Sequence, residues 1–186
     1  PDHSAITLSP GSSIRYDRLS FGKKERYIEL AGKAFFNVNH LKNVPFHINT
    51  PLADIQVLGT QFQVVSTKDS TVTWIVSGKV RFSTSRQCTD LTQNMRAIVN
   101  RENGQIQVSA KDHLNELAWK THRLVYQNTP LREVVADLEK LYQIKLKNIP
   151  PQNLKLTATF DTMEISDILY IINQTLDTNL TITIQQ

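Results

Sequence analysis

The feature that most constrains this chain is an alternation of apolar and polar residues that recurs over its first 110 residues. Apolar side chains at every second position share one face of an extended strand, so this pattern is typical of half-buried strands. A glycine inside a strand indicates a bulge or a sharp bend. Two such runs are Ile28, Leu30, Gly32, Ala34, Phe36 and Val38, and Val72, Trp74, Val76, Gly78, Val80 and Phe82. We therefore predict a mainly β domain over residues 1–110, either a curled two-layer β-sandwich or a short β-solenoid.

Hairpins are expected at both ends of this β domain. The strand-like segments 6–8 and 14–16 are separated by Ser-Pro-Gly-Ser, which is typical of a turn. The segments 96–100 and 105–109 are separated by Arg-Glu-Asn-Gly in the same way. Between them, the alternation places Trp74 on one face with Val72 and Val76, which favours a place in the core over a platform for a sugar ring.

The pattern changes after residue 110. Residues 111–122 are charged and weakly helical, and we interpret them as a connector. Two amphipathic helical stripes follow, each flanked by short alternating runs. The stripes are Leu131, Val134, Val135, Leu138, Leu141 and Tyr142, and Ile165, Ile168, Leu169, Ile172 and Leu176. We predict that residues 123–186 form a small α+β domain of two βαβ units.

The two βαβ units are an internal repeat. A shift of 34 residues aligns Leu131 with Ile165, and the same shift aligns Leu138 with Ile172. A period of 34 also occurs in helical repeat proteins. That interpretation is rejected because each unit here contains one helix between strands, and two copies are too few for a solenoid.

Composition and motifs give no support for catalysis. The net charge of +4 is spread along the chain, without the concentrated basic patch that nucleic acid requires. Cys88 is the single cysteine, which excludes an intramolecular disulfide. The five histidines lack metal-ligand spacing, and no nucleophile elbow or phosphate-binding loop is present. We therefore expect no enzyme activity, no catalytic residue, no metal and no cofactor.

Several motifs of the β region resemble one family. They are R-Y-I-E-L-A-G-K-A-F-F-N-V at 26–38, P-F-H-I-N-T at 45–50, D-I-Q-V-L-G-T-Q-F-Q-V at 54–64 and V-S-G-K-V at 76–80. Together they resemble the FecR family, the iron-dicitrate sensor type of transmembrane anti-sigma factor, over residues 1 to about 110. Lys33 stands where the family usually has a glutamate, which would alter the charge preference if that position contacts a partner.

The second region carries its own resemblance. Residues 118–142 resemble the opening of the C-terminal domain usual in Bacteroidetes members of the family. That domain is similar to the short N-terminal signalling domain of secretins and TonB-dependent transducers.

The resemblance implies a role in cell-surface signalling. It implies that this is the periplasmic part of an anti-sigma factor, lying at the periplasmic face of the inner membrane, with a membrane helix and a sigma-binding cytoplasmic segment preceding Pro1 in the parent protein. The signalling domain of a TonB-dependent outer-membrane transducer would be its partner, and an extracytoplasmic-function sigma factor would be the target. The alternatives are a periplasmic carbohydrate- or peptidoglycan-binding module and a hydrolase whose site the sequence does not reveal.

A partner could bind to the last strand, which we expect over residues 178–185. Its apolar residues alternate with threonines, and it carries no charge that would repel an added strand. A strand covered within the chain itself is the alternative. The candidate partner-binding residues are Leu180, Thr181, Ile182, Thr183 and Ile184.

Overall fold

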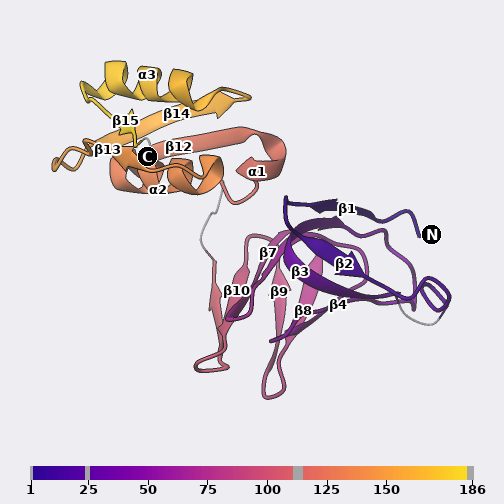
Figure 1. Cartoon of the computed structure of the whole chain (residues 1–186). Helices are drawn as coiled ribbons and strands as arrows, with labels where there is room; N and C mark the ends of the chain where they lie inside the picture. The colour runs from indigo at the N-terminus through magenta and orange to yellow at the C-terminus, as the bar shows by residue number, and fades with distance from the viewer. Residues whose placement is uncertain (1, 24–25, 111–114, 184–186) are drawn as a thin grey trace. The chain divides into compact units, whose positions relative to one another are not determined.

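A computed structural model describes residues 2–23, 26–110 and 115–183 of the chain (Figure 1). The chain divides into two compact units, Pro1–Asp112 and His113–Gln186. Each unit has its own cluster of buried apolar side chains.

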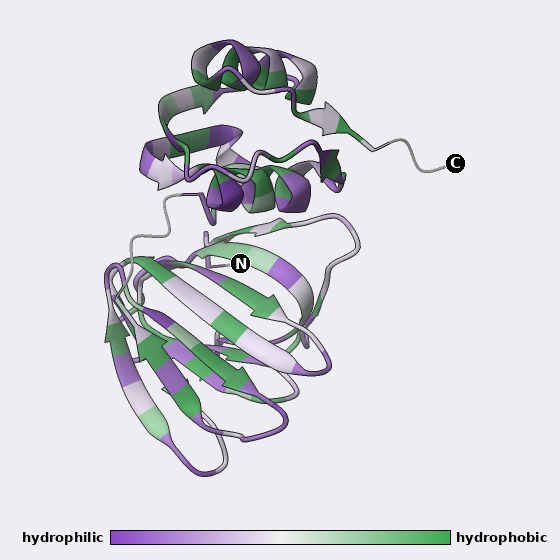
Figure 2. Ribbon diagram, turned by 90° about the vertical axis from the view of Figure 1, so that its left-hand side faces the viewer, coloured by the Kyte–Doolittle hydropathy of each residue, from purple (hydrophilic) through white to green (hydrophobic). Residues whose placement is uncertain are grey.

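The described residues of the N-terminal unit form one curled sheet of 11 strands. Along its strands, hydrophobic and hydrophilic residues alternate in bands, as Figure 2 shows. The strands are β1 (Ala5–Leu8), β2 (Ser13–Arg15), β3 (Arg26–Asn37), β4 (Phe46–Asn49), β5 (Asp54–Val57), β6 (Gln61–Ser66), β7 (Ser70–Ser77), β8 (Lys79–Ser83), β9 (Cys88–Thr92), β10 (Arg96–Asn100) and β11 (Ile106–Ser109).

Strand β3 belongs to both layers of this sheet. Its first residues pair in parallel with β4, and its last residues, from Gly32 onward, pair antiparallel with β6. The strand bends at Gly32, where φ is +94° and a Cβ atom would lie 2.5 Å from the Ser12 hydroxyl. The prediction of a curled two-layer β-sandwich is confirmed, since all described strand pairs except β3–β4 in this unit are antiparallel and a solenoid would stack parallel strands.

The predicted closing hairpin is confirmed, but the predicted opening hairpin is wrong. Strands β10 and β11 pair antiparallel as expected. Strands β1 and β2 instead pair with two successive stretches of β3 and lie end to end along its edge. The reason lies in the loop between them, because Ser9 donates to the Lys33 carbonyl and Ser12 accepts from the Lys33 N–H. The loop thus passes around Lys33 without reversing the chain.

The predicted inward face of β7 is also wrong. Val72, Trp74 and Val76 lie on the half-buried outer side, and the core receives Ile75 with two threonines. The buried threonines are tolerated because their hydroxyls are bonded: Thr73 donates to the Gln63 carbonyl, and Thr71 is 2.9 Å from the Thr50 hydroxyl. The chain turns at Gly78, with φ of +87°, so the alternation beyond it starts again on the other face and Val80 and Phe82 enter the core.

A fully buried arginine lies at the start of β3. Arg26 is 0% exposed, and each of its guanidinium nitrogens donates a hydrogen bond. Its guanidinium carbon lies 5.3 Å from the centre of the Phe46 ring. The acceptors are the carbonyl oxygens of Asn39, Val44 and Leu58 and the carboxylate of Asp2, at 2.8–3.1 Å.

Asp2 supplies the charge that balances Arg26. Burial alone would raise the pKa of Asp2, but hydrogen bonds from the Ser4 side chain and from Arg26 outweigh burial and lower that pKa below its ordinary value. The carboxylate therefore stays ionised, and the buried ion pair stays complete, at neutral pH.

The C-terminal unit is a small α+β domain, as predicted. Each βαβ unit contributes one strand to each of two separate sheets, in which β12 pairs antiparallel with β14 and β13 pairs antiparallel with β15. The last strand is shorter than expected, and residues 111–114 of the expected connector lie outside the described residues. The elements are α1 (Ala118–Thr121), β12 (Arg123–Pro130), α2 (Leu131–Tyr142), β13 (Leu146–Lys147), β14 (Lys155–Asp161), α3 (Ile165–Leu176) and β15 (Thr181–Ile182).

The internal repeat gives this unit an approximate two-fold axis. In the first sheet Val125 lies opposite Thr159, and in the second Lys147 lies opposite Thr181. Both pairs join residues that are 34 positions apart, so the axis passes through each sheet at equivalent residues. Helices α2 and α3 end alike, with Gln143 and Asp177 in the left-handed region.

We expect Asp2→Ala to lower the free energy of unfolding of the N-terminal unit by about 3–5 kcal/mol, because it leaves a buried guanidinium without its counter-charge. Asp2 has a lowered pKa in the folded state, so its contribution is present above the unfolded-state pKa of about 4 and is lost as pH falls through the folded-state value. The difference in the free energy of unfolding between the wild-type chain and Asp2→Ala should therefore become smaller as the pH falls. Denaturant titrations followed by amide exchange of core strands would measure it.

The control is Glu29→Ala, which removes the exposed ion pair between Arg15 and Glu29. That variant should change stability by less than about 1 kcal/mol. Equal effects of the two substitutions would contradict the role given to Asp2.

In the C-terminal unit, Leu138→Ala and the equivalent Ile172→Ala should each cost roughly 2–5 kcal/mol, since both side chains are fully buried in the shared core. Tyr170→Ala, on the exposed side of α3, should cost far less. Unfolding midpoints of the three variants would test the equivalence of the two repeats, and a large difference between Leu138→Ala and Ile172→Ala would count against it.

Candidate protein-binding edge of the C-terminal unit

The structure brings only part of the predicted partner-binding segment to the surface. Leu180 is 2% exposed and packs in the core, whereas Ile182 is 38% exposed and Thr181 is exposed beside it. Thr183 is half-buried, and Ile184 lies outside the described residues.

The direction of the backbone groups in β15 follows from its pairing with β13. Thr183 donates its N–H to the Lys145 carbonyl at 2.7 Å. In an antiparallel pair every second residue forms the bonds between strands, so the backbone of Thr181 also faces β13. The N–H and C=O of Ile182 therefore point to the open side of β15.

At Leu180, two residues before Ile182, the side chain of Asn173 from α3 occupies the backbone groups on this same side. Its side-chain amide accepts from the Leu180 N–H at 2.8 Å and donates to the Leu180 carbonyl at 3.0 Å, as a neighbouring strand would. Its carbonyl oxygen also accepts from the Thr178 hydroxyl. Among the described residues of β15, Ile182 thus carries the backbone groups that remain available to a partner.

The first repeat contains an equivalent hydrogen bond between a helix side chain and the following strand. Glu139, which is 34 positions before Asn173, accepts the Leu146 N–H at 2.8 Å. That hydrogen bond, with the ion pair to Lys145, lowers the pKa of Glu139. Each helix therefore holds the strand that follows it through a polar side chain at the same position of the repeat.

Helix α3 exposes apolar residues that the helical stripe does not include. Tyr170 is 67% exposed and Ile171 is 36% exposed. No charged residue occurs from position 168 to position 176. The sequence contains a signal for this surface, because Tyr170 and Ile171 are large apolar residues outside the buried stripe of α3.

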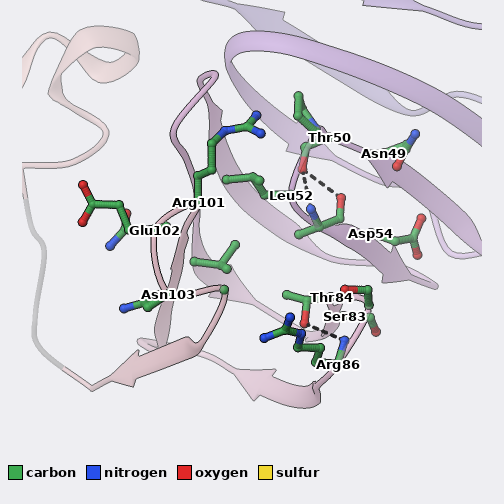
Figure 3. A pocket seen from close by; sticks show the side chains of 16 residues that line it. Asn49, Thr50, Leu52, Asp54, Ser83, Thr84, Arg86, Arg101, Glu102 and Asn103 are labelled. Carbon is green, nitrogen blue, oxygen red and sulfur yellow. Dashed lines mark hydrogen bonds between the residues drawn. The ribbon is translucent and has the colours of Figure 1, made fainter.

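A polar hollow of about 580 Å³ lies at the end of the N-terminal sheet, between the β4–β5, β8–β9 and β10–β11 turns (Figure 3). Hydrogen bonds fix its walls: Thr50 bonds to both backbone groups of Ala53, and Thr84 accepts from the Arg86 N–H. No aromatic residue lines it, so it lacks a ring on which a sugar could stack. The hollow therefore gives no specific support to the carbohydrate-binding alternative.

Within the ranges that the structure describes, no group of three or more His, Cys, Asp or Glu side chains could hold a metal ion. Hydrogen bonds and ion pairs from the exposed side chains of Arg81 and Lys79 on β8 lower the pKa of Asp90 to about 2. In the same described part, no helix is long and apolar enough to span a membrane.

Two family models match the chain. The model described as "FecR protein" matches residues 1–81, and the model described as "FecR, C-terminal" matches residues 123–186. The chain belongs to the FecR family. This confirms the resemblance carried by the motifs of both regions. Members of this family are regulatory proteins of the anti-sigma type and are not enzymes.

Solved structures agree with this membership. Two crystal structures of a "putative anti-sigma factor from Parabacteroides distasonis ATCC 8503" are each 26% identical to this FecR-family chain, with a TM-score of 0.67. Each alignment covers 100% of this chain and 92% of the other. Among curated proteins no relative matches the chain.

We expect Asn173→Ala to destabilise the C-terminal unit by about 1–3 kcal/mol and to speed exchange of the Leu180 amide proton, since that N–H loses its acceptor. Asn173→Asp keeps the acceptor oxygen and should preserve slow exchange. Gln174→Ala, one position along on an exposed part of α3, serves as the control. Unchanged Leu180 exchange in Asn173→Ala would show that the side chain does not close this edge.

Proposed function

We propose that this chain is the periplasmic part of an anti-sigma factor that receives a signal from a TonB-dependent outer-membrane transducer. In this proposal the signal passes across the inner membrane to an extracytoplasmic-function sigma factor. The observation that carries the proposal is the match of the entire chain, in both units, to the solved anti-sigma factor from Parabacteroides distasonis. The two family models support the same role.

The C-terminal unit is proposed to contact the transducer at the open side of β15. Backbone groups on a sheet edge give affinity for an extended segment, and neighbouring side chains give specificity. The proposed contact comprises the exposed part of the segment from Leu180 to Ile184, with the outward N–H and C=O of Ile182 at its centre.

The proposal is tested by calorimetry between the chain and the isolated signalling domain of the transducer encoded beside it. Binding at a 1:1 ratio is expected, and the signalling domain of an unrelated transducer should produce no binding heat. Absence of binding to the neighbouring domain at concentrations up to about 1 mM, where free energies of association are only about 4 kcal/mol, would contradict the proposed partner.

Ile182→Pro should weaken this binding about tenfold, because it removes one outward N–H and one hydrogen bond is worth roughly 1–1.5 kcal/mol. The N–H groups of Thr181 and Thr183 face β13 and remain in place, so the strand keeps its intramolecular pairing. Ile182→Ala is the matched control because it shortens the side chain and retains the N–H. Equal affinity of the proline and alanine variants would exclude backbone pairing at β15.

A further inference from the structure

Among the described residues, no strand pairs with β14 on the side away from β12, so this edge of β14 is a second open edge of the C-terminal unit. Thr162 donates to the His122 carbonyl, and Leu131 donates to the Leu154 carbonyl. These bonds fix which residues of β14 face β12, because the backbone direction alternates along a strand. The backbone groups that face away from β12 belong to Lys155, Thr157, Thr159 and Asp161.

The corresponding edge of β12 is protected. Asn115 accepts the Val125 N–H at 2.8 Å. The pairing shifts between Tyr126 and Thr129, which marks a bulge, and Pro130 has no N–H. Soluble proteins commonly protect sheet edges with such features. None of them occurs in β14, which is seven residues long and contains no proline.

The two-fold repeat shows what is missing from the β14 edge. Beside β12, Asn115 also donates to Asp137 of α2 at 2.8 Å, so one side chain joins the strand to the helix. The equivalents of Val125 and Asp137, 34 positions on, are Thr159 and Ile171. Within the described residues no side chain accepts the Thr159 N–H, and Ile171 is partly exposed. Among the described residues the β14 edge therefore lacks the side chain that protects β12, and the helix position equivalent to Asp137 is the apolar Ile171.

The residues of β14 are complementary to the same strand run in the opposite direction. The strand reads Lys-Leu-Thr-Ala-Thr-Phe-Asp, centred on Ala158. In an antiparallel pair of two such strands, Lys155 lies opposite Asp161 of the second copy, and Thr157 lies opposite its Thr159. Opposite charges and threonine pairs are favourable across strands. All four outward residues fall on hydrogen-bonded positions in this register.

We propose that two copies of this chain associate through their β14 edges, which join two β12–β14 sheets into one four-stranded antiparallel sheet. The contact is isologous, so it closes as a dimer with two-fold symmetry and leaves no further β14 edge. It uses a different strand from the transducer contact proposed above. The partner is a second copy because the charges of Lys155 and Asp161 complement each other across the pair, and Asp161 keeps its exposed neighbour Arg123 at 3.4 Å.

Sedimentation equilibrium of the 186-residue chain from about 10 µM to 1 mM tests the proposal. This concentration range is chosen because a contact made by two seven-residue strands is small, and small contacts are expected to be weak. A monomer–dimer equilibrium is expected. Thr159→Pro should weaken it at least about tenfold, because proline removes an outward donor. Proline is tolerated on an edge whose N–H faces solvent, so the variant should fold, which circular dichroism verifies. Thr159→Val retains the N–H and is the control.

A charge exchange tests the register. Lys155→Asp alone places two aspartates opposite each other at both ends of the pair, and Asp161→Lys alone places two lysines there, so each variant should be monomeric. Mixed in equal amounts, the two variants restore opposite charges at both ends and should form a heterodimer.

A wild-type chain that stays monomeric up to 1 mM, or a dimer that Thr159→Pro leaves intact, would overturn the proposal. So would a mixture of the charge variants that remains monomeric. The Ile182→Pro variant should dimerise normally, which separates this contact from the transducer contact at β15.

Discussion

The arrangement of the N-terminal unit depends on the buried positive charge of Arg26. A guanidinium removed from water is costly unless all its donors are bonded and its charge is balanced. Here the acceptors come from the β3–β4 loop, the β5–β6 loop and the segment before β1, so one side chain fixes three separate parts of the chain around the start of β3. The loops carry the carbonyl groups, and Asp2 alone carries the balancing charge among the described contacts. The motif that begins with this arginine therefore specifies tertiary structure as well as a strand.

Symmetry is the corresponding constraint in the C-terminal unit. The repeat places Glu139 and Asn173 at equivalent positions, and each closes the backbone of the following strand. Where the repeat is imperfect, the two halves differ in what they leave open. Asn115 closes an edge in the first half and has no counterpart among the described residues of the second. Where a protecting side chain is present in one half and missing in the other, the backbone of the second half remains available for pairing.

The sequence predicted the strands, the bends and the repeat because each has a local physical cause. Alternation follows from strand geometry, and the bend at Gly32 follows from a backbone conformation that a side chain would obstruct. It did not predict which face of β7 is buried, because threonines enter a core only when distant groups accept their hydroxyl protons, as Gln63 does for Thr73. The sequence predicted a longer last strand, with more exposed residues than the structure has. The cause is that the side chain of Asn173 occupies both backbone groups of Leu180, and the alternation pattern around Leu180 does not report this distant contact. Pairing partners, as for β1 and β2, depend on contacts remote in sequence that periodicity does not report.

The continuity of β3 has a consequence for how the N-terminal unit opens. In a sandwich of two independent sheets, the layers are held together by side-chain packing and can slide or separate as bodies. Here one covalent strand runs through both layers and turns at Gly32, so neither layer can be displaced without pulling on the other. The two layers act as a single cooperative block, and a load applied at the β1 edge reaches the far layer along the backbone itself.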